Sequence, residues 1–90
     1  MYSLIISHDS EDNIFVASSK DKLEVIALDY IKNNMSDIVN FGSDIIHSSL
    51  SEALKINDFD LATELYSDIC SFQDEHVYMK IVPAHMVYDS

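Results

Sequence analysis

The stretch His76–Val82, which reads His-Val-Tyr-Met-Lys-Ile-Val, decides the fold class because its hydrophobic period differs from that of the residues before it. Apolar side chains alternate with polar or amphipathic ones along it: Val77, Met79 and Ile81 against Tyr78 and Lys80. A period of two residues is typical of a β-strand with one buried face. Pro83 has no backbone N–H, so the strand is not expected to continue past it as a central strand.

Helical spacing precedes this strand. The first helix is expected from about Lys20 to Asn34, with apolar side chains recurring at Leu23, Ile26, Ala27 and Tyr30. Ser18 and Ser19 precede this helix, and Asp21 stands three residues after Ser18, which is the spacing of an N-terminal capping box.

Two further helices follow in the sequence. The second begins near Ser36 or near Ser43, with Gly42 as a candidate break. One face of it carries mostly apolar side chains: Ile45, Ile46, Ser49, Leu50, Ala53 and Leu54. Asn57 and Asp58 end it, and either can cap the third helix. That helix is expected to end near Phe72, and it carries Leu61, Ala62, Leu65, Tyr66 and Ile69.

The N-terminal residues predict a β-hairpin. Tyr2, Leu4 and Ile6 alternate with Ser3 and Ser7, although Ile5 interrupts the pattern, and residues 14–17 are apolar. The polar stretch from His8 to Asn13 between them is expected to form the loop. The element order is therefore ββαααβ. It indicates an α+β fold, with a small, mainly antiparallel three-stranded sheet and helices packed on one face. The last strand is expected to pair with the first, and residues 1–90 are expected to form a single domain.

The charge of the chain restricts its partners. The 90 residues include 16 Asp and Glu but only 5 Lys and no Arg, which gives a net charge of -11. A protein that binds nucleic acid directly, or an anionic membrane, needs basic side chains to face the phosphates. Direct nucleic-acid or membrane binding is therefore not expected.

The sequence favours a cytoplasmic protein. Cys70 is the single cysteine, so the chain cannot form an intramolecular disulfide, and a reducing compartment suits it. Residues 1–7 lack the basic start and the long apolar core of a signal peptide. We expect a soluble protein of the cytoplasm, which would be the host cytoplasm if the source is viral.

The third helix carries an acidic stripe. Asp60, Glu64 and Asp68 recur every four residues, beside Leu61, Leu65 and Ile69, which are expected to form the buried face. Like charges at this spacing destabilise a helix by a few tenths of a kcal/mol per pair. Successive carboxylates stand roughly 6 Å apart along the helix axis, a spacing comparable to that of phosphates along a nucleic-acid strand.

Other carboxylates extend the negative surface. A second patch is expected in the hairpin loop at Asp9, Glu11 and Asp12, and further candidate partner-binding residues are Asp21, Glu24, Asp44 and Glu52. An acidic solvated surface that serves only solubility is an alternative interpretation. The chain is rich in residues with AT-rich codons, a bias that should also raise Lys, so the shortage of Lys and Arg favours selection against positive charge.

No catalytic motif is present. Asp9, Glu11 and Asn13 have the spacing that begins a calcium loop, but the sixth position is not Gly and the twelfth is Lys20. The four histidines show no His-Glu-x-x-His spacing, and Cys70 is expected to be a small core residue. We expect no enzyme, no metal and no cofactor.

Small size, extreme acidity and the absence of Arg resemble phage and mobile-element inhibitors that imitate nucleic acid, of the anti-CRISPR or anti-restriction type. The resemblance implies that acidic side chains occupy the basic groove of a nucleic-acid-binding protein or complex. The alternative is a small adaptor or a homodimeric accessory protein that binds through an apolar patch near the C-terminus, at Tyr78, Met79, Met86 and Tyr88.

Overall fold

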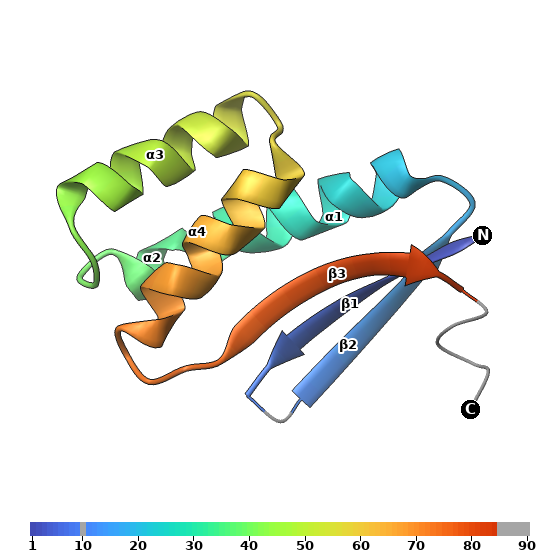
Figure 1. The fold of residues 1–90 in the computed structure, drawn as a ribbon, viewed down its shortest axis with the longest axis horizontal. Helices are drawn as coiled ribbons and strands as arrows, with labels where there is room; N and C mark the ends of the chain where they lie inside the picture. Colours follow the sequence, from blue (N-terminus) through green and yellow to red (C-terminus); the bar gives the residue numbers. More distant parts are fainter. Residues whose placement is uncertain (10, 85–90) are drawn as a thin grey trace.

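The fold joins a three-stranded sheet to a layer of helices (Figure 1). The structure is a computed structural model that describes residues 1–9 and 11–84. Its elements are, in chain order, β1 (Tyr2–His8), β2 (Glu11–Ala17), α1 (Lys20–Asn33), α2 (Met35–Ile38), α3 (Asp44–Lys55), α4 (Phe59–Ser71) and β3 (Val77–Pro83). The predicted α+β class and the order ββαααβ are confirmed, with the short helix α2 as an addition.

The strand order is β2-β1-β3, and both pairings are antiparallel. The predicted pairing of the last strand with the first is confirmed, since Leu4 of β1 stands opposite Ile81 of β3. Because β1 is central, β3 lies at an edge of the sheet, which accommodates Pro83.

The hairpin differs from its prediction. The polar stretch from His8 to Asn13 was expected to be a loop, but β1 continues to His8 and pairs it with Glu11 of β2. Asp9 adopts a left-handed conformation, with φ of 56°, which lets the chain reverse within a tight turn. Glu11 and Asp12 therefore lie on strand β2 and not in a loop.

The helix starts follow the sequence in part. The Ser43 side chain caps α3, because its Oγ atom accepts a hydrogen bond from the N–H of Ile46. Gly42, at φ of 80°, supplies the break before it. The capping box predicted at Ser18 is wrong, since Ser19 is the N-cap residue of α1 and its side chain makes no capping hydrogen bond.

The core lies between the helices and one face of the sheet. Leu4 and Ile6 of β1 pack against Leu23 and Ala27 of α1, and the helices α3 and α4 contribute a second buried cluster next to them: Leu50, Ala53, Leu54, Ala62, Tyr66, Ile69 and Cys70. The prediction of a buried Cys70 is confirmed.

The buried faces of α3 and α4 differ from the predicted ones by a rotation about each helix axis. Ile45 was expected on the buried face of its helix, but 79% of it is exposed, and Leu61 of α4 is 39% exposed. Both residues lie in the first turn of a helix, where the neighbouring elements do not cover them. The buried side of α4 is instead formed by Ala62, Tyr66, Ile69 and Cys70.

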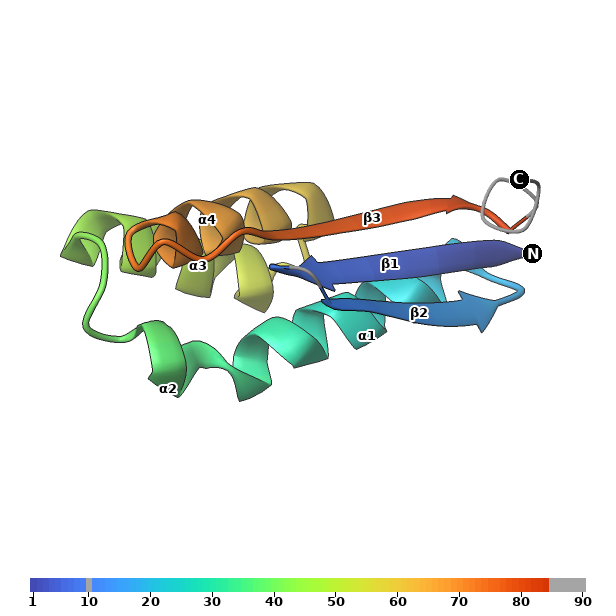
Figure 2. The ribbon, with the colours of Figure 1, turned by 90° about the horizontal axis from the view of Figure 1, so that it is seen from below.

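The opposite face of the sheet carries no helix within the described residues, and Figure 2 looks onto it. Because side chains alternate along a strand, Ser3, Ile5 and Ser7 of β1 point to this face. We call it the open face because no described helix covers it, although Ser3 and Ser7 themselves are buried there. Their partners on the neighbouring strands share it: Val16, Ile14 and Asp12 of β2, and Val82, Lys80 and Tyr78 of β3.

Candidate functional site: an acidic surface

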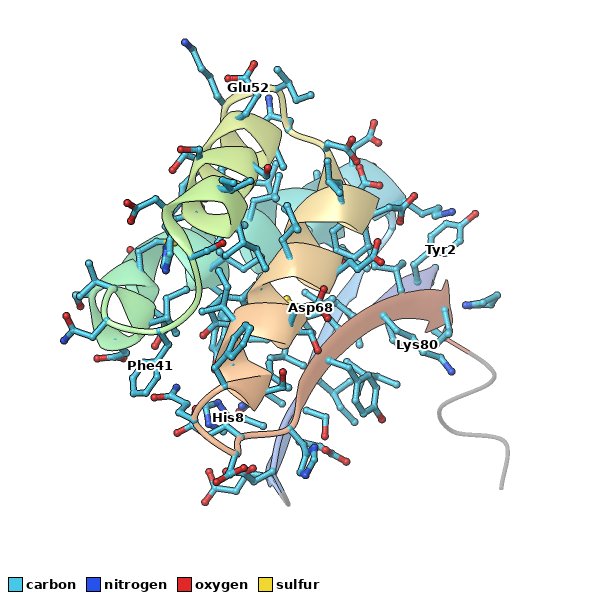
Figure 3. The ribbon with its side chains drawn as sticks, turned by 60° about the vertical axis from the view of Figure 1, so that its left-hand side comes forward. Tyr2, His8, Phe41, Glu52, Asp68 and Lys80 are labelled. Atoms are coloured by element: carbon cyan, nitrogen blue, oxygen red, sulfur yellow. The ribbon has the colours of Figure 1, made fainter. Side chains whose placement is uncertain are left out.

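The acidic stripe, Asp60, Glu64 and Asp68, lies on the solvent side of α4, and all three residues are exposed. Each helical residue turns the chain by about 100°, so Glu64 stands about 200° around the axis from the buried Tyr66. The stripe was expected beside the buried face, and the structure places it opposite that face. Figure 3 shows Asp68 on the outward side of α4, between α3 and β3.

The stripe carboxylates have no role in holding the described fold together. Within residues 1–9 and 11–84, the side chains of Asp60, Glu64 and Asp68 accept no hydrogen bond and form no ion pair. Both ion pairs found in this part of the chain involve His8. No lysine in it therefore lies within ion-pairing distance of a carboxylate. The carboxylates of Glu64 and Asp68 therefore face solvent without a close countercharge in the described fold, while Asp60 lines a groove that Lys20 and Lys80 also line.

A second group of carboxylates forms at the end of the sheet, and we call it the acidic corner: Asp9, Glu11, Asp12, Asp74 and Glu75. The register that places His8 opposite Val77 brings the β1–β2 turn next to the connection between α4 and β3. Asp68 lies in the last turn of α4, just before that connection. The stripe thus runs along the helix towards the acidic corner.

Asp9 fixes the two connections to each other. Its N–H donates a hydrogen bond of 2.7 Å to the carbonyl oxygen of His76, and its Oδ1 atom accepts one of 3.0 Å from the N–H of His76. Asp9 was predicted to contact a partner, and the structure gives it a structural role as well. Glu11 and Asp12, on the exposed strand β2, carry no such hydrogen bond within the described residues.

His8 lies inside the acidic corner (Figure 3). Its Nε2 atom is 3.2 Å from a carboxylate oxygen of Glu75 and 3.8 Å from one of Asp9. The Tyr30 hydroxyl lies 3.5 Å from the Nδ1 atom of the same ring. A proton on Nε2 lets the ring donate to Glu75, while Nδ1 can accept from Tyr30. This arrangement connects β1 to α1 and to the α4–β3 connection.

The remaining predicted site residues lie elsewhere. Asp44 and Glu52 are exposed at the two ends of α3, and Lys55 follows Glu52 by three residues. Asp21 is exposed in the first turn of α1. Glu24 lines a groove between α1, α4 and β3, and this groove also contains Asp60 and two lysines, Lys20 and Lys80. The predicted set therefore does not form one continuous patch.

Sequence reasoning missed Asp74 and Glu75. They are separated from Asp9 by most of the chain, and only the β1–β3 register brings them together. Adjacent acidic residues just before a predicted strand were the available signal, but nothing local indicated which other loop they face.

The apolar patch of the alternative hypothesis is not assembled as expected. Tyr78 is 53% exposed on the open face of the sheet, whereas Met79 points to the helices and packs against the core. Met86 and Tyr88 lie outside the described residues.

The buried titratable groups are protected from solvent. Burial raises the pKa of the Cys70 thiol, and burial also raises the pKa of Tyr66 and of Tyr30, so these groups stay protonated at neutral pH. A buried protonated thiol is a poor nucleophile. Among residues 1–9 and 11–84, no three His, Cys, Asp or Glu side chains are grouped to hold a metal ion.

Comparisons with known proteins give no relative: no family model, no curated protein and no solved structure matches the chain. None of the helices in the described part of the chain is both long enough and apolar enough to cross a membrane.

Proposed function

We propose that this protein inhibits a nucleic-acid-binding protein or complex by occupying its basic groove with carboxylates. The observation that carries the proposal is the position of Asp60, Glu64 and Asp68, exposed on α4 opposite its buried side. Repulsion between like charges four residues apart costs helix stability, and no hydrogen bond or ion pair within the described fold offsets that cost. A basic partner would supply the missing countercharge.

The arrangement suits an extended basic surface. The stripe covers two helical turns, or roughly 12 Å, and it runs towards the acidic corner. Lys or Arg side chains arranged to follow a phosphate backbone can pair with such a row of carboxylates. With a net charge of -11, the protein also attracts a basic partner over a distance, so association should be fast and weakened by salt.

The biological setting that we propose is an anti-defence protein of a phage or mobile element, of the anti-CRISPR or anti-restriction type. The effectors of such systems hold nucleic acid in positively charged channels, which are the surfaces that an acidic mimic can block. In this mechanism the protein is not an enzyme and needs no cofactor.

The proposal is tested by salt-graded capture. The immobilised chain is exposed at low ionic strength to lysate of the source cell or its host, and bound proteins are eluted with KCl and identified by mass spectrometry. The eluted protein is then bound to its nucleic acid with and without the chain. We expect a basic nucleic-acid-binding protein that leaves at moderate salt and that releases its nucleic acid when the chain is added.

Two outcomes contradict the proposal. One is capture of a partner that carries no basic surface and stays bound through high salt. The other is a captured nucleic-acid-binding protein whose affinity for nucleic acid is unchanged by a saturating amount of the chain.

A further inference from the structure

Strand β2 is exposed on both of its faces. Every residue from Glu11 to Val16 is exposed, and three consecutive large apolar residues are among them: Ile14 at 49%, Phe15 at 37% and Val16 at 42%. Ile14 and Val16 point to the open face of the sheet, and Phe15 points to the helix side. A partner lying on one face would leave Phe15 or its neighbours uncovered. A strand added at the edge would cover all three.

The free edge of β2 offers backbone groups for such a strand. Asp9 donates its N–H to His76, and Ala84 donates its N–H to Met1, so the odd-numbered residues of β1 direct their backbone groups to β3. The even-numbered residues of β1 then bond to β2, and Leu4 forms a hydrogen-bonded pair with Phe15. Between such pairs, the N–H and C=O groups of Ile14 and Val16 point away from β1, to the free edge.

The other edge of the sheet is less suited to pairing. Pro83 has no N–H, and the side chain of Lys80 is a charge of the kind that discourages edge pairing. Near the start of β3, the carbonyl oxygen of Val77 accepts a hydrogen bond of 2.5 Å from Ser67 of α4. Strand β2 has neither Lys nor Pro.

We propose that β2 pairs with β2 of a second copy of this chain, antiparallel and about a two-fold axis at Phe15. In this register Phe15 faces its own copy, and Ile14 of one protomer forms a hydrogen-bonded pair with Val16 of its partner. Asp12 and Glu11 then extend past Ala17, where β2 of the partner ends, towards its Ser18 and Ser19. Apolar residues therefore meet apolar ones, and no carboxylate stands opposite another. The two sheets join into one.

Charge gives this pairing a salt dependence opposite to that of the proposed inhibition. Two chains of charge -11 repel each other at a distance, and salt screens that repulsion. Dimerisation through β2 should therefore strengthen as KCl is raised, whereas binding to a basic partner should weaken. The two proposals can fail independently.

The direct test is amide hydrogen exchange of the full chain, measured by NMR in a dilution series. Within the described fold the amides of Ile14 and Val16 have no acceptor from β1, so they are unprotected in a monomer. We expect both amides to exchange slowly in concentrated protein and to lose that protection on dilution. Fast exchange of both amides at every concentration overturns the proposal.

Variants distinguish the edge from the open face, with sedimentation velocity as the measurement. Ile14→Pro removes an outward N–H from an edge strand, where proline is tolerated, and Val16→Lys places a charge at the same edge. Tyr78→Lys is the control on the open face, away from β2. Circular dichroism checks that each variant is folded.

We expect the wild-type chain and Tyr78→Lys to sediment with twice the 10.2 kDa mass of the chain, and a folded Ile14→Pro or Val16→Lys variant to sediment with that single mass. A wild-type monomer at all concentrations and salt levels overturns the proposal. So does a dimer that survives both β2 variants and is lost in Tyr78→Lys.

Discussion

The Oδ1 atom of Asp9 accepts a hydrogen bond of 3.0 Å from the backbone N–H of His76, 67 residues further along the chain. This contact joins the β1–β2 turn to the α4–β3 connection, and it places the carboxylates of both connections in one acidic corner. The residue that makes it also adopts a positive φ of 56°. The fold and the proposed binding surface therefore share Asp9.

Asp9→Ala should destabilise the protein by about 2 kcal/mol. The substitution removes the side-chain acceptor of the His76 N–H, and it puts Ala, which tolerates a positive φ less well than Asp does, at this position. Asp9→Asn should cost less, since its side-chain oxygen can accept the same bond and Asn tolerates this conformation. Urea unfolding measures both. Equal losses for Asp9→Ala and for the exposed control Asp12→Ala would contradict the structural role of Asp9.

Helix capping gives a second prediction. Ser43 and Asp58 accept hydrogen bonds of 3.3 and 3.2 Å from the N–H groups of Ile46 and Leu61, so Ser43→Ala and Asp58→Ala should each cost about 1 kcal/mol. Ser19→Ala is the matched control, because its side chain makes no capping bond. Thermal unfolding should place Ser19→Ala nearest the wild type. A larger loss for Ser19→Ala than for the other two would disagree with the structure.

Alkaline pH should weaken the fold. Burial raises the pKa of the Cys70 thiol above its ordinary 9.0 and the pKa of the Tyr66 hydroxyl above its ordinary 10.0. The unfolded chain loses these protons first, so the free energy of unfolding falls as pH rises above about 9. Tyr66→Phe should make the fall above pH 10 shallower, and the exposed Tyr78→Phe is its control. Denaturant unfolding across this range measures the slope, and an unchanged slope in Tyr66→Phe would contradict the burial.

The element types could be predicted because they depend on local periodicity. The strand at residues 76–82 and the helices on either side of Asn57 were recognisable from spacing alone. The buried faces were less predictable, because Ile45 and Leu61 fit the helical period of a core face. Each lies in the first turn of its helix, beyond the reach of the neighbouring elements, and the period cannot register that.

The candidate site was predictable only where it lies on one helix. The acidic stripe follows from the spacing of Asp60, Glu64 and Asp68. The acidic corner does not, because it requires the register between β1 and β3 that sets His8 opposite Val77. Glu11 and Asp12 were predicted to lie in a loop because polar residues near a turn do not show whether a short hairpin continues through them.

The measurement that tests the central claim most directly is the affinity of charge-reversal variants for the captured basic partner. Glu64→Lys combined with Asp68→Lys changes the stripe. Asp29→Lys combined with Asp37→Lys makes the same change in net charge at exposed positions on α1 and α2. Isothermal titration at two KCl concentrations gives the affinity, and thermal unfolding confirms that both variants are folded.

If α4 contacts the basic groove, the stripe variant should bind roughly tenfold or more weakly than the matched variant at low salt, and raising KCl should narrow the difference. Equal affinities of the two variants would contradict the claim, because the protein would then act through its overall charge and not through the carboxylates of Glu64 and Asp68.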